Sequence, residues 1–509
     1  MDIIKPPKKE FLASLASGRI LPLFREIAVP GLTPLAALEV MKGDGYPVLL
    51  ESARINEKIG RYSFVAADPY LIFRSHGDSI ELDLPAAPKG KYGKRATMKR
   101  KPLQKLRELL SNYRAERVPG LPPFIGGAIG FFSYDFVHQF EKLPRKAKDD
   151  LAIPDSNFIF VDRVVAFDHI LNKAWVIVAP GAREQELGFR RPEHDQWPEL
   201  YDKAVERVNA LVNLLEGSVK EEAQLHTGAS GSPGQHPLSP RLTQTEFESM
   251  VRQCREYIAA GDIYQANLSQ RFSAPVYDAD PLRLYKVLRS INPSPFAAYL
   301  DFNGLQLVSS SPERLVRLRE GVADTRPIAG TRRRGKDGVE MQVLSAELLT
   351  NEKERAEHIM LLDLERNDLG KVCDYGTVEV DEMMVVEDYS HVIHIVSNVR
   401  GKLTAGRDAF DLFRAVFPGG TITGVPKVRC MEIIDELEPV ARGAYTGSIG
   451  YFSSAGDMDM NIIIRTFMVK EGMAHFQVGA GIVADSDPTR EYAETLQKAE
   501  ALKKALELL

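Results

Sequence analysis

Residues 261–272, Gly261-Asp-Ile-Tyr-Gln-Ala-Asn-Leu-Ser-Gln-Arg-Phe272, form a predicted strand that begins directly after a predicted helix. Its polar residues share one face: Gln265, Asn267, Ser269 and Arg271. The opposite face holds Tyr264, Ala266, Leu268 and Phe272. Four polar side chains on one face either line a cleft or face solvent, and both alternatives stay open at this point.

The helix before this strand is predicted from its start signal and its periodicity. Thr245 and Glu248 have the spacing of a capping box. Apolar residues then recur at helical intervals up to Gly261: Phe247, Met250, Val251, Cys254 and Ile258. This pattern predicts that Cys254 lies in the core.

The whole chain has 509 residues, with 65 Lys and Arg against 70 Asp and Glu, which gives a net charge of −5. At about 150 residues per domain the length suggests about three domains, although one large two-part enzyme fits equally well. With 44% apolar residues, a sizeable core is possible, which excludes collagen-like and disordered proteins. The mild acidity argues against a nucleic-acid-binding protein, which needs a basic face.

The cysteines and the N-terminus bear on the compartment. Cys254, Cys373 and Cys430 lie far apart in the sequence, so neither a zinc site nor a disulfide framework is expected. The N-terminus lacks the apolar core of a signal peptide, and no run of about 18 uncharged apolar residues is present. We therefore expect a soluble, cytoplasmic protein.

One change in composition divides the chain. Residues 227–240 are rich in Gly, Ser and Pro and have too little apolar area to offset the entropy cost of ordering. We predict an N-terminal region over residues 1–215, a flexible linker over 216–240 and a second region over 241–509. A basic stretch at residues 89–101 is predicted to be a solvated loop or a strand edge.

Two glutamate pairs are candidates for binding a cation. Glu354 and Glu357, and likewise Glu491 and Glu494, are three residues apart in helical patterns, so each pair shares a helix face, and Lys498 continues the second face. Four converging carboxylates would repel one another, and a hard cation such as Mg²⁺ would relieve that repulsion. Taken alone, either pair is more often a solvated helix face.

Three other features favour a substrate that carries carboxylates. The glycine-rich turn at residues 417–427 and the stretch at residues 477–483 offer backbone amides. Arg465, on a predicted apolar strand, needs an anionic partner if it is buried.

Glu313 and His394 are a residue pair of the kind that protonates a leaving oxygen, although a single histidine is more often structural.

Taken together, these motifs resemble the chorismate-utilising enzymes, namely anthranilate synthase component I and aminodeoxychorismate synthase component I. The resemblance rests on residues 261–272, on Arg326-Pro-Ile-Ala-Gly-Thr331, on Leu361-Leu-Asp-Leu-Glu-Arg-Asn-Asp368 and on Gly479-Ala-Gly-Ile-Val-Ala-Asp-Ser486. It implies an α+β fold with a large two-part antiparallel β-sandwich core and helices outside. It also implies that residues 1–215 are an anthranilate synthase component I-like region and that residues 241–509 are the chorismate-binding catalytic domain.

The resemblance also implies a role for each matching position. Glu354, Glu357, Glu491 and Glu494 would hold Mg²⁺ on the ring carboxylate of chorismate. Glu313, His394, Gln265 and Thr331 would be catalytic, with Glu313 and His394 assisting loss of the C4 hydroxyl. The substrate-binding residues would be Ala329, Gly330, Thr421, Tyr445, Arg465, Gly479, Ala480, Gly481 and Lys498.

The nucleophile is predicted to be ammonia. Relatives that add water resemble this sequence but carry a lysine where Gln265 stands, and glutamine cannot be a general base. None of the three cysteines lies on a glycine-flanked turn of the kind that glutamine hydrolysis needs. We therefore expect a separate glutamine amidotransferase subunit as the partner that supplies ammonia.

Two products remain as alternatives. Aminodeoxychorismate synthases resemble this chain at residues 266–268, 292–300, 417–424 and 457–461. Ala329, where many of them carry a covalent lysine, resembles anthranilate synthases instead. We predict 4-amino-4-deoxychorismate as the product, with anthranilate and pyruvate as the alternative. An inactive regulatory homologue is a remote third reading, because no predicted metal or catalytic residue is missing.

Part of the chain resembles the tryptophan pocket of anthranilate synthases. Glu51 and Ser52 match one wall, and Pro295 and Phe296 lie on the other. That second wall departs from the pattern, since Phe296-Ala297 stand where tyrosine and methionine are usual. We therefore do not expect tight inhibition by tryptophan.

Overall fold

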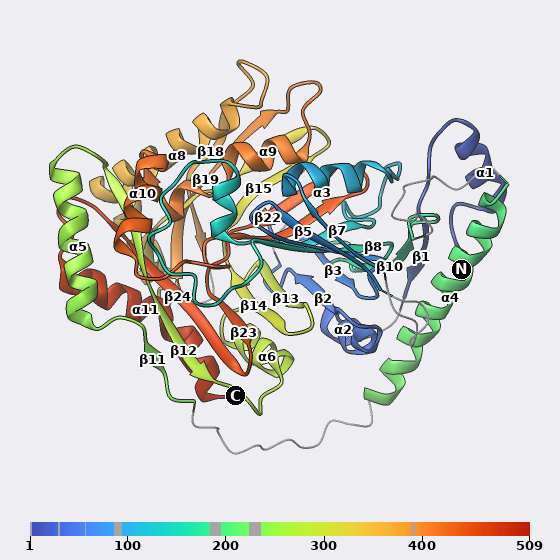
Figure 1. Ribbon diagram of the computed structural model, residues 1–509, viewed down its shortest axis with the longest axis horizontal. Helices are drawn as coiled ribbons and strands as arrows, with labels where there is room; N and C mark the ends of the chain where they lie inside the picture. Colours follow the sequence, from blue (N-terminus) through green and yellow to red (C-terminus); the bar gives the residue numbers. More distant parts are fainter. Residues whose placement is uncertain are drawn as a thin grey trace.

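The computed structural model describes residues 3–28, 31–55, 58–85, 94–183, 195–222, 236–388 and 392–509. These residues form two large sheets, and all pairings between the named strands are antiparallel (Figure 1). The strands of the first sheet are, in spatial order, β1 (Leu23–Ile27), β10 (Lys173–Val178), β9 (Arg163–Asp168), β3 (Tyr62–Ala66), β2 (Val48–Glu51), β13 (Phe296–Asp301), β14 (Leu305–Ser311), β23 (Thr466–Lys470), β24 (Met473–Ile482), β12 (Gln265–Pro275) and β11 (Ser239–Pro240), with β20 (Gly424–Val425) beside β12.

The second sheet, like the first, contains strands from both predicted regions of the chain. Its strands are β17 (Ile328–Arg333), β19 (Val392–Lys402), β16 (Val322–Thr325), β15 (Arg314–Arg319), β22 (Met458–Asn461), β21 (Ser448–Ser453), β7 (Gly127–Phe132), β8 (Ser156–Val161), β4 (Leu71–His76), β5 (Ser79–Leu84) and β6 (Lys94–Lys99), with β18 (Glu379–Asp388) beside β19. Each sheet therefore joins strands from both halves of the chain, at the β2–β13 and β7–β21 pairings. The two predicted regions form one continuous body.

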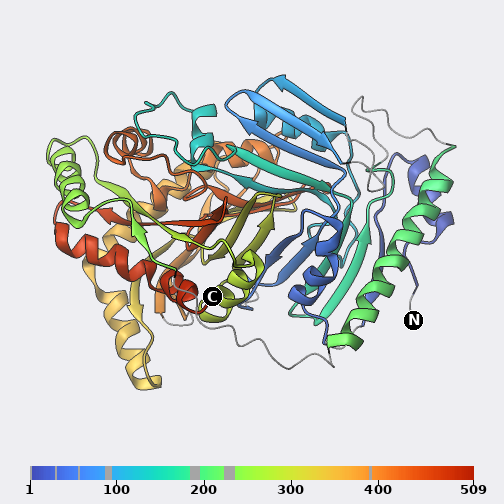
Figure 2. The ribbon, with the colours of Figure 1, turned by 60° about the horizontal axis from the view of Figure 1, so that its bottom comes forward.

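Helices cover the outer faces of the two sheets, as Figures 1 and 2 show. They are α1 (Lys8–Ala16), α2 (Pro34–Met41), α3 (Pro102–Ser111), α4 (Trp197–Glu222), α5 (Gln244–Ala259), α6 (Pro281–Ile291), α7 (Gly338–Thr350), α8 (Glu352–Gly370), α9 (Ala409–Val416), α10 (Lys427–Leu437) and α11 (Pro488–Glu507). None of the helices in the described ranges combines the length and apolar character that crossing a membrane requires.

The main core lies between the two sheets. Phe64 of β3 packs edge-on against Tyr451 of β21, with 5.4 Å between ring centroids, and both rings belong to one buried apolar cluster. In β7, glycine is required for close strand approach, because a Cβ on Gly130 would lie 2.1 Å from the Asn157 carbonyl oxygen. The predicted α+β class, with a sandwiched antiparallel core and outer helices, is confirmed.

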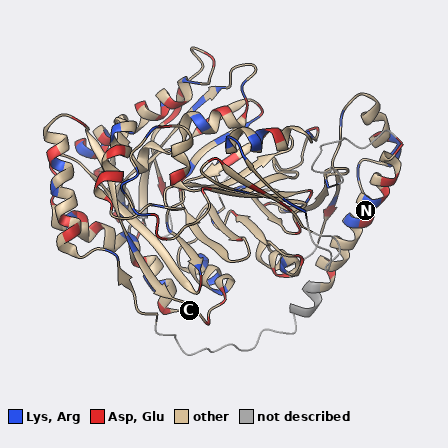
Figure 3. Cartoon of the chain, viewed as in Figure 1, with Lys and Arg blue, Asp and Glu red and all other residues tan. Residues whose placement is uncertain are grey.

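Charged side chains follow the helices and loops, and Lys and Arg alternate with Asp and Glu there, while the strands are mainly uncharged (Figure 3). The lysine-rich β6 is the last strand of the second sheet, which matches the strand edge predicted within residues 89–101. Residues 89–93 of that stretch lie outside the described residues. An edge strand that carries lysines resists pairing with another chain.

Some local predictions need correction. The capping box of α5 uses Thr243 and Glu246 instead of Thr245 and Glu248, since both pairs have the required spacing. Arg465 lies between β22 and β23, not on a strand. Both ends of the predicted linker, residues 216–240, have regular structure: α4 continues to Glu222, and Ser239–Pro240 form β11. Residues 223–235 lie outside the described residues, and there the linker stays a prediction.

Candidate active site

The four predicted metal-binding glutamates lie in the first two turns of the helices α8 and α11. Asn351 caps α8 by accepting a hydrogen bond from the Glu354 N–H at 3.0 Å, and Asp487 caps α11 by accepting from the Arg490 N–H at 2.9 Å. The two pairs lie close enough to interact. Burial raises the pKa of Glu357, and the charges of Glu354 on the same helix and Glu494 on the other helix add to that increase. Burial and the neighbouring Glu494 likewise raise the pKa of Glu491.

Each of three carboxylates already has a polar partner. Arg332 Nη1 lies 3.1 Å from Glu354 Oε1, and Lys498 Nζ lies 2.8 Å from Glu494 Oε1. The Gln265 amide donates to Glu357 Oε1 at 2.9 Å. These contacts offset part of the mutual repulsion of the carboxylates.

The donor set has the right chemistry for Mg²⁺ but does not enclose a site by itself. Among the described residues, no group of three or more His, Cys, Asp or Glu side chains is arranged to hold a metal ion. Mg²⁺ usually takes only one or two carboxylates and completes its shell with water and substrate oxygens. The four glutamates fit that pattern, and Mg²⁺ binding stays a prediction.

Strands β12 and β24 form the floor beside these glutamates. Gly481 stands opposite Asn267 in the register, and a Cβ on Gly481 would lie 2.5 Å from Gln265 Nε2. A Cβ on Gly479 would lie 2.5 Å from Asn267 Oδ1 and 2.8 Å from the Tyr445 hydroxyl. Only glycine therefore leaves room for these side chains, which explains the Gly-Ala-Gly spacing.

Two amide oxygens on this floor stand out because they are buried without partners. Neither Gln265 Oε1 nor Asn267 Oδ1 accepts a hydrogen bond within the described part of the chain. An unpaired buried acceptor costs about 1–3 kcal/mol, which a bound donor would recover. The other two residues predicted on this face are engaged elsewhere: Ser269 binds Glu438, and Arg271 binds Asp150. Half of the predicted polar face therefore lies at this site. Below, the word cleft denotes the region bounded by this floor, the four glutamates, Arg465, Glu313 and His394.

Arg465, Tyr445 and Lys498 supply the positive and polar side of the cleft. The Arg465 guanidinium makes no ion pair or hydrogen bond with the described residues. Burial lowers the pKa of Arg465, and the Tyr445 phenol opposes that shift. Lys498 Nζ also donates to the Gly479 carbonyl at 3.0 Å. Arg465 has a left-handed φ of 54°, and such strain at a non-glycine residue is typical of functional sites.

Glu313 lies between β14 and β15 and is buried. Its Oε1 meets no donor in good hydrogen-bond geometry within the described part of the chain, although the Thr421 hydroxyl lies near enough to act on its pKa. Burial raises the pKa of Glu313 to about 8, against the opposing effects of Thr421, the Ile328 N–H and Lys498. At neutral pH this carboxyl therefore carries a proton and can act as a general acid.

His394 has the opposite character. It faces β17, where Thr331 is its partner in the register, and its Nδ1 lies 3.1 Å from the Gly330 carbonyl oxygen. A carbonyl only accepts, so Nδ1 carries the proton. Burial lowers the pKa of His394 to about 4, which keeps the ring neutral and makes it a weaker base than an ordinary imidazole. The site thus combines a protonated carboxyl at Glu313 with a neutral imidazole at His394.

The segment opposite His394 reaches the glutamates. Gly330 has φ of 62°, and a Cβ there would lie 2.9 Å from Glu354 Oε2. Ala329, beside it, is buried. The side chain of Thr331 lies outside the described residues. Ala480 packs its methyl group into the core under α5, so it borders the cleft through its backbone alone.

The residues predicted as a tryptophan pocket line a separate cavity of about 120 Å³: Glu51, Ser52, Pro295 and Phe296. Glu51 is already occupied, because Arg289 donates to its two oxygens at 2.7 and 2.8 Å and the Tyr285 hydroxyl donates as well. Arg314 lies 5.0 Å above the Phe296 ring. Glu313 and Arg314 are neighbours, so one dipeptide borders both the cleft and the cavity.

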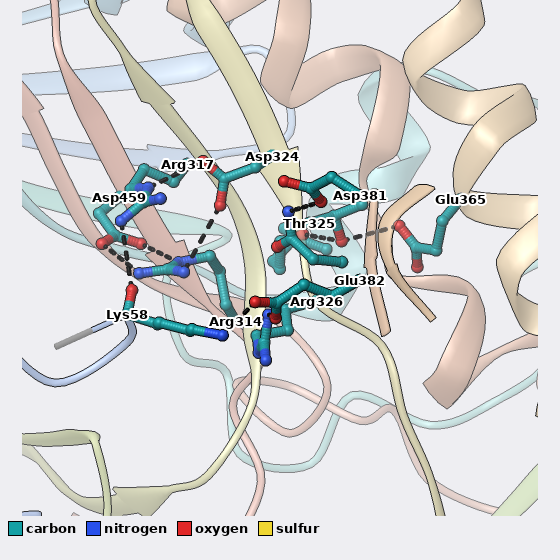
Figure 4. Close-up of polar contacts among 12 residues, drawn as sticks. Lys58, Arg314, Arg317, Asp324, Thr325, Arg326, Glu365, Asp381, Glu382 and Asp459 are labelled. Atoms are coloured by element: carbon teal, nitrogen blue, oxygen red, sulfur yellow. Dashed lines mark hydrogen bonds and ion pairs between the residues drawn. The ribbon is translucent and has the colours of Figure 1, made fainter. Parts of the chain in front are cut away.

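A charge network at the cavity wall was missed in the sequence. Arg314 bridges Asp459, at 3.0 Å, and Asp324, at 3.5 Å (Figure 4). Arg317 binds Asp324 at 2.8 Å, and the same chain of contacts continues through β16 to Thr325 and Glu365. The alternating arginines of Arg314-Leu-Val-Arg-Leu-Arg319 were the available signal, since charges on a central strand need partners.

Comparisons with known proteins identify the family of this chain. The family model for the chorismate binding enzyme matches residues 56–504. The anthranilate synthase component 1 of Acetivibrio thermocellus is 38% identical over 489 residues, 96% of this chain and 95% of the relative. The aminodeoxychorismate synthase component 1 of Bacillus subtilis (strain 168) is 43% identical over 464 residues, 91% of this chain and 92% of the relative.

A solved structure is similar as well. The crystal structure of anthranilate synthase component I from Streptococcus pneumoniae TIGR4 superposes with a TM-score of 0.72 and 34% identity, over 88% of this chain and 93% of that one. The matched residues include Glu313, His394 and the four glutamates. The chain therefore belongs to the chorismate binding enzyme family and is a chorismate-utilising enzyme.

Proposed function

We propose that this chain aminates chorismate with ammonia and forms 4-amino-4-deoxychorismate. The observation that carries this proposal is the pair of unpaired amide oxygens, Gln265 Oε1 and Asn267 Oδ1, on the cleft floor. Ammonia has three N–H donors and suits two buried acceptors, whereas neither amide can activate water as a base. Asn267 also belongs to the sequence pattern in which aminodeoxychorismate synthases resemble this chain.

The ammonia comes from a partner subunit with glutaminase activity. The chain has three cysteines, and all three are buried. Burial raises the pKa of Cys254 to about 12, that of Cys373 to about 11 and that of Cys430 to about 12. No thiol of this chain is therefore a ready nucleophile for glutamine hydrolysis.

Binding of the substrate rests on the cations and amides of the cleft. Arg465 and the Tyr445 hydroxyl take one carboxylate of chorismate, with the backbone amides of Gly479 and Gly481 nearby. Glu354, Glu357, Glu491 and Glu494 would hold Mg²⁺. When bound, that ion neutralises the second carboxylate and polarises the ring to which it is attached.

The reaction exchanges the C4 hydroxyl for an amino group. Protonated Glu313 gives its proton to the C4 oxygen, which leaves as water. Ammonia, held by Gln265 and Asn267, supplies the new C–N bond, and neutral His394 relays the proton that the nitrogen releases back to ionised Glu313. The enolpyruvyl group stays on the ring, so no pyruvate is formed.

Anthranilate formation is the second candidate. It is favoured by Ala329, which stands where a covalent lysine acts in many aminodeoxychorismate synthases, and by the relatives named anthranilate synthase component 1. In that reaction the amino group enters at C2 and pyruvate leaves. The two candidates share the cleft and differ in the carbon that ammonia attacks.

Product analysis separates the two candidates. The purified chain is incubated with chorismate, Mg²⁺ and ammonium salt, and its products are separated by chromatography. We expect an aminated product that keeps its enolpyruvyl group, and no activity with glutamine in place of ammonium. Anthranilate with an equal amount of pyruvate would overturn the proposal. Asn267→Val, with Asn213→Val at an exposed position of α4 as a control, tests whether Asn267 directs the amination.

A further inference from the structure

Arg442 is a buried arginine beside the cleft floor, and none of the roles above uses it. It lies in the connection between α10 and β21, with 2% of its surface exposed. Its guanidinium carbon lies 4.9 Å from the ring centroid of Tyr134 and 5.6 Å from that of Tyr445. A buried arginine so close to a substrate-binding tyrosine either receives the substrate itself or holds the protein groups that receive it.

The hydrogen bonds of Arg442 decide between these two roles. A guanidinium has five N–H donors. Two of them bind Glu438 at the end of α10, with Nε 3.0 Å from Oε2 and Nη2 2.7 Å from Oε1. Nη2 also donates to the Asn267 carbonyl oxygen at 2.6 Å, and Nη1 donates to the Ile422 carbonyl oxygen at 2.9 Å and to the Thr446 hydroxyl at 3.2 Å. All five donors are therefore engaged within the protein, and none is left for a substrate.

The bond to Asn267 lies on an edge of the floor strand β12 that lacks a continuous neighbour. Within the described part of the chain, that edge pairs with β20 at one end and with β11 at the other, and no strand fills the gap between them. Arg442 and Glu438 fill it instead, because Arg442 binds the Asn267 carbonyl and Glu438 accepts from the Ser269 N–H and hydroxyl, each at 2.8 Å. The ion pair thus satisfies backbone groups that a neighbouring strand would otherwise satisfy.

The other two acceptors of Arg442 belong to two further parts of the cleft. Ile422 follows Thr421 in the glycine-rich turn. Thr446 follows Tyr445, and its hydroxyl donates onward to the Tyr445 carbonyl oxygen at 2.6 Å. One guanidinium therefore joins the floor strand, the glycine-rich turn and the turn that carries the substrate-binding tyrosine.

We propose that Arg442 is a positioning residue that sets the spacing of these three elements, and thereby the distance between the groups that bind the chorismate carboxylate and those that bind ammonia. The planar fork is the essential property, because its five donors point in fixed directions, whereas a lysine ammonium has three donors on one atom. This inference rests on the proposed roles of Tyr445 and Asn267. Arg465, which makes no ion pair or hydrogen bond with the described residues, takes the substrate directly.

The test is Arg442→Lys, which keeps a positive charge beside Glu438 but loses the fork. Chorismate consumption is followed while chorismate and ammonium are varied in turn, so the result does not depend on which product forms. We expect the KM for chorismate and the KM for ammonium to rise together, each by about 10-fold, since a misplacement of about 1 Å costs about 10²-fold in all.

Arg429→Lys is the matched control. Arg429 also pairs with a glutamate, Glu432, at 2.8 Å and lies 5.3 Å from the ring centroid of a tyrosine, Tyr257, but it does so at a partly exposed position of α10. The same chemical change there should leave both KM values and kcat unchanged.

A purely structural role for Arg442 would give a different pattern. Partial unfolding reduces the amount of active enzyme, so kcat would fall while both KM values stayed the same. That pattern, wild-type constants in Arg442→Lys, or a rise in only one of the two KM values would overturn the inference. If Arg442→Lys does not fold, Thr446→Val decides, because it removes a single acceptor of the guanidinium and both KM values should still rise together.

A binding measurement separates this inference from the proposed function. If the wild-type enzyme consumes no chorismate with ammonium, the proposed function fails. Calorimetric titration with chorismate then decides the inference, since Arg442→Lys should weaken binding and Arg429→Lys should not. Equal affinities in the two variants would overturn the positioning role.

Discussion

The cleft and the cavity meet at the dipeptide Glu313-Arg314, yet they differ in whether their buried polar and charged groups have partners. In the cleft, Gln265 Oε1, Asn267 Oδ1 and Glu313 Oε1 are buried without partners, and the Arg465 guanidinium has no recorded anion among the described residues. In the cavity, Arg314 binds Asp459 and Glu51 binds Arg289. The cleft keeps the unsatisfied groups that a polar substrate completes, whereas the charges of the cavity satisfy one another.

The largest effect should follow from Glu313→Gln. Removing the general acid is expected to lower kcat by about 10²–10⁴-fold, since that is the usual contribution of positioned proton transfer. Steady-state assays of chorismate loss with ammonium measure it. Glu51→Gln makes the same chemical change in the cavity instead of the cleft, so kcat should stay close to the wild-type value. Equal losses of kcat in the two variants would contradict the distinction between a catalytic cleft and a structural cavity.

Glu313→Gln should also change how stability depends on pH. Burial raises the pKa of Glu313 from 4.5 to about 8, so between those values the folded protein holds a proton that the unfolded chain has lost. Stability from this group therefore falls as pH rises from about 5 to 8. The melting temperature of Glu313→Gln relative to that of wild type should rise across this window, and a flat difference would contradict the assignment.

Arg465→Gln should weaken substrate binding without loss of stability. The wild-type guanidinium bears the cost of burial before substrate arrives, so its removal should leave the melting temperature equal or higher. The lost charge-assisted bonds should raise KM by about 10–100-fold. Arg314→Gln is the matched change in the cavity network, and it should lower the melting temperature while KM stays close to that of wild type.

Glu51→Gln should destabilise the fold. Arg289 would keep its charge but lose the ion pair and one of its two acceptor oxygens on residue 51, with a cost of about 2 kcal/mol because Arg289 is itself partly exposed. Urea unfolding followed by circular dichroism measures this free energy. Glu320→Gln, at an exposed pair with Arg117, should change stability by less than about 0.5 kcal/mol.

The smallest effect is expected from tryptophan. Its ammonium group would need an anion, but the Glu51 carboxylate is held by Arg289 and Tyr285, and Phe296 stands under Arg314. Added tryptophan should therefore leave the rate of amination nearly unchanged and give no heat of binding in calorimetry. Strong inhibition would mean that the cavity rearranges to free its charges.

Several parts of the site could be predicted from residue patterns. The helical spacing of Glu354 and Glu357 placed both on one face of α8, and the alternation after Gly261 placed Gln265 and Asn267 together. The glycines at 479 and 481 marked a close approach of side chains, which the structure assigns to Gln265 and Asn267. These properties depend on local geometry, so they follow from spacing alone.

Other parts depend on contacts between distant segments. Thr325, Leu315 and Glu365 are brought together by β15, β16 and α8, and no local pattern links them. The same holds for the joining of the two predicted regions into one body. The β2–β13 and β7–β21 pairings make that connection. Spacing along the chain carries no information about such pairings.

The sequence by itself determined the family, the α+β class and the residue types of the cleft, because these depend on chemistry and local periodicity. Only the tertiary structure decided which acid is protonated, which amide oxygens lack partners and which charges neutralise one another. Those properties arise from burial and from the fields of neighbouring groups, and both exist only after the two sheets have packed.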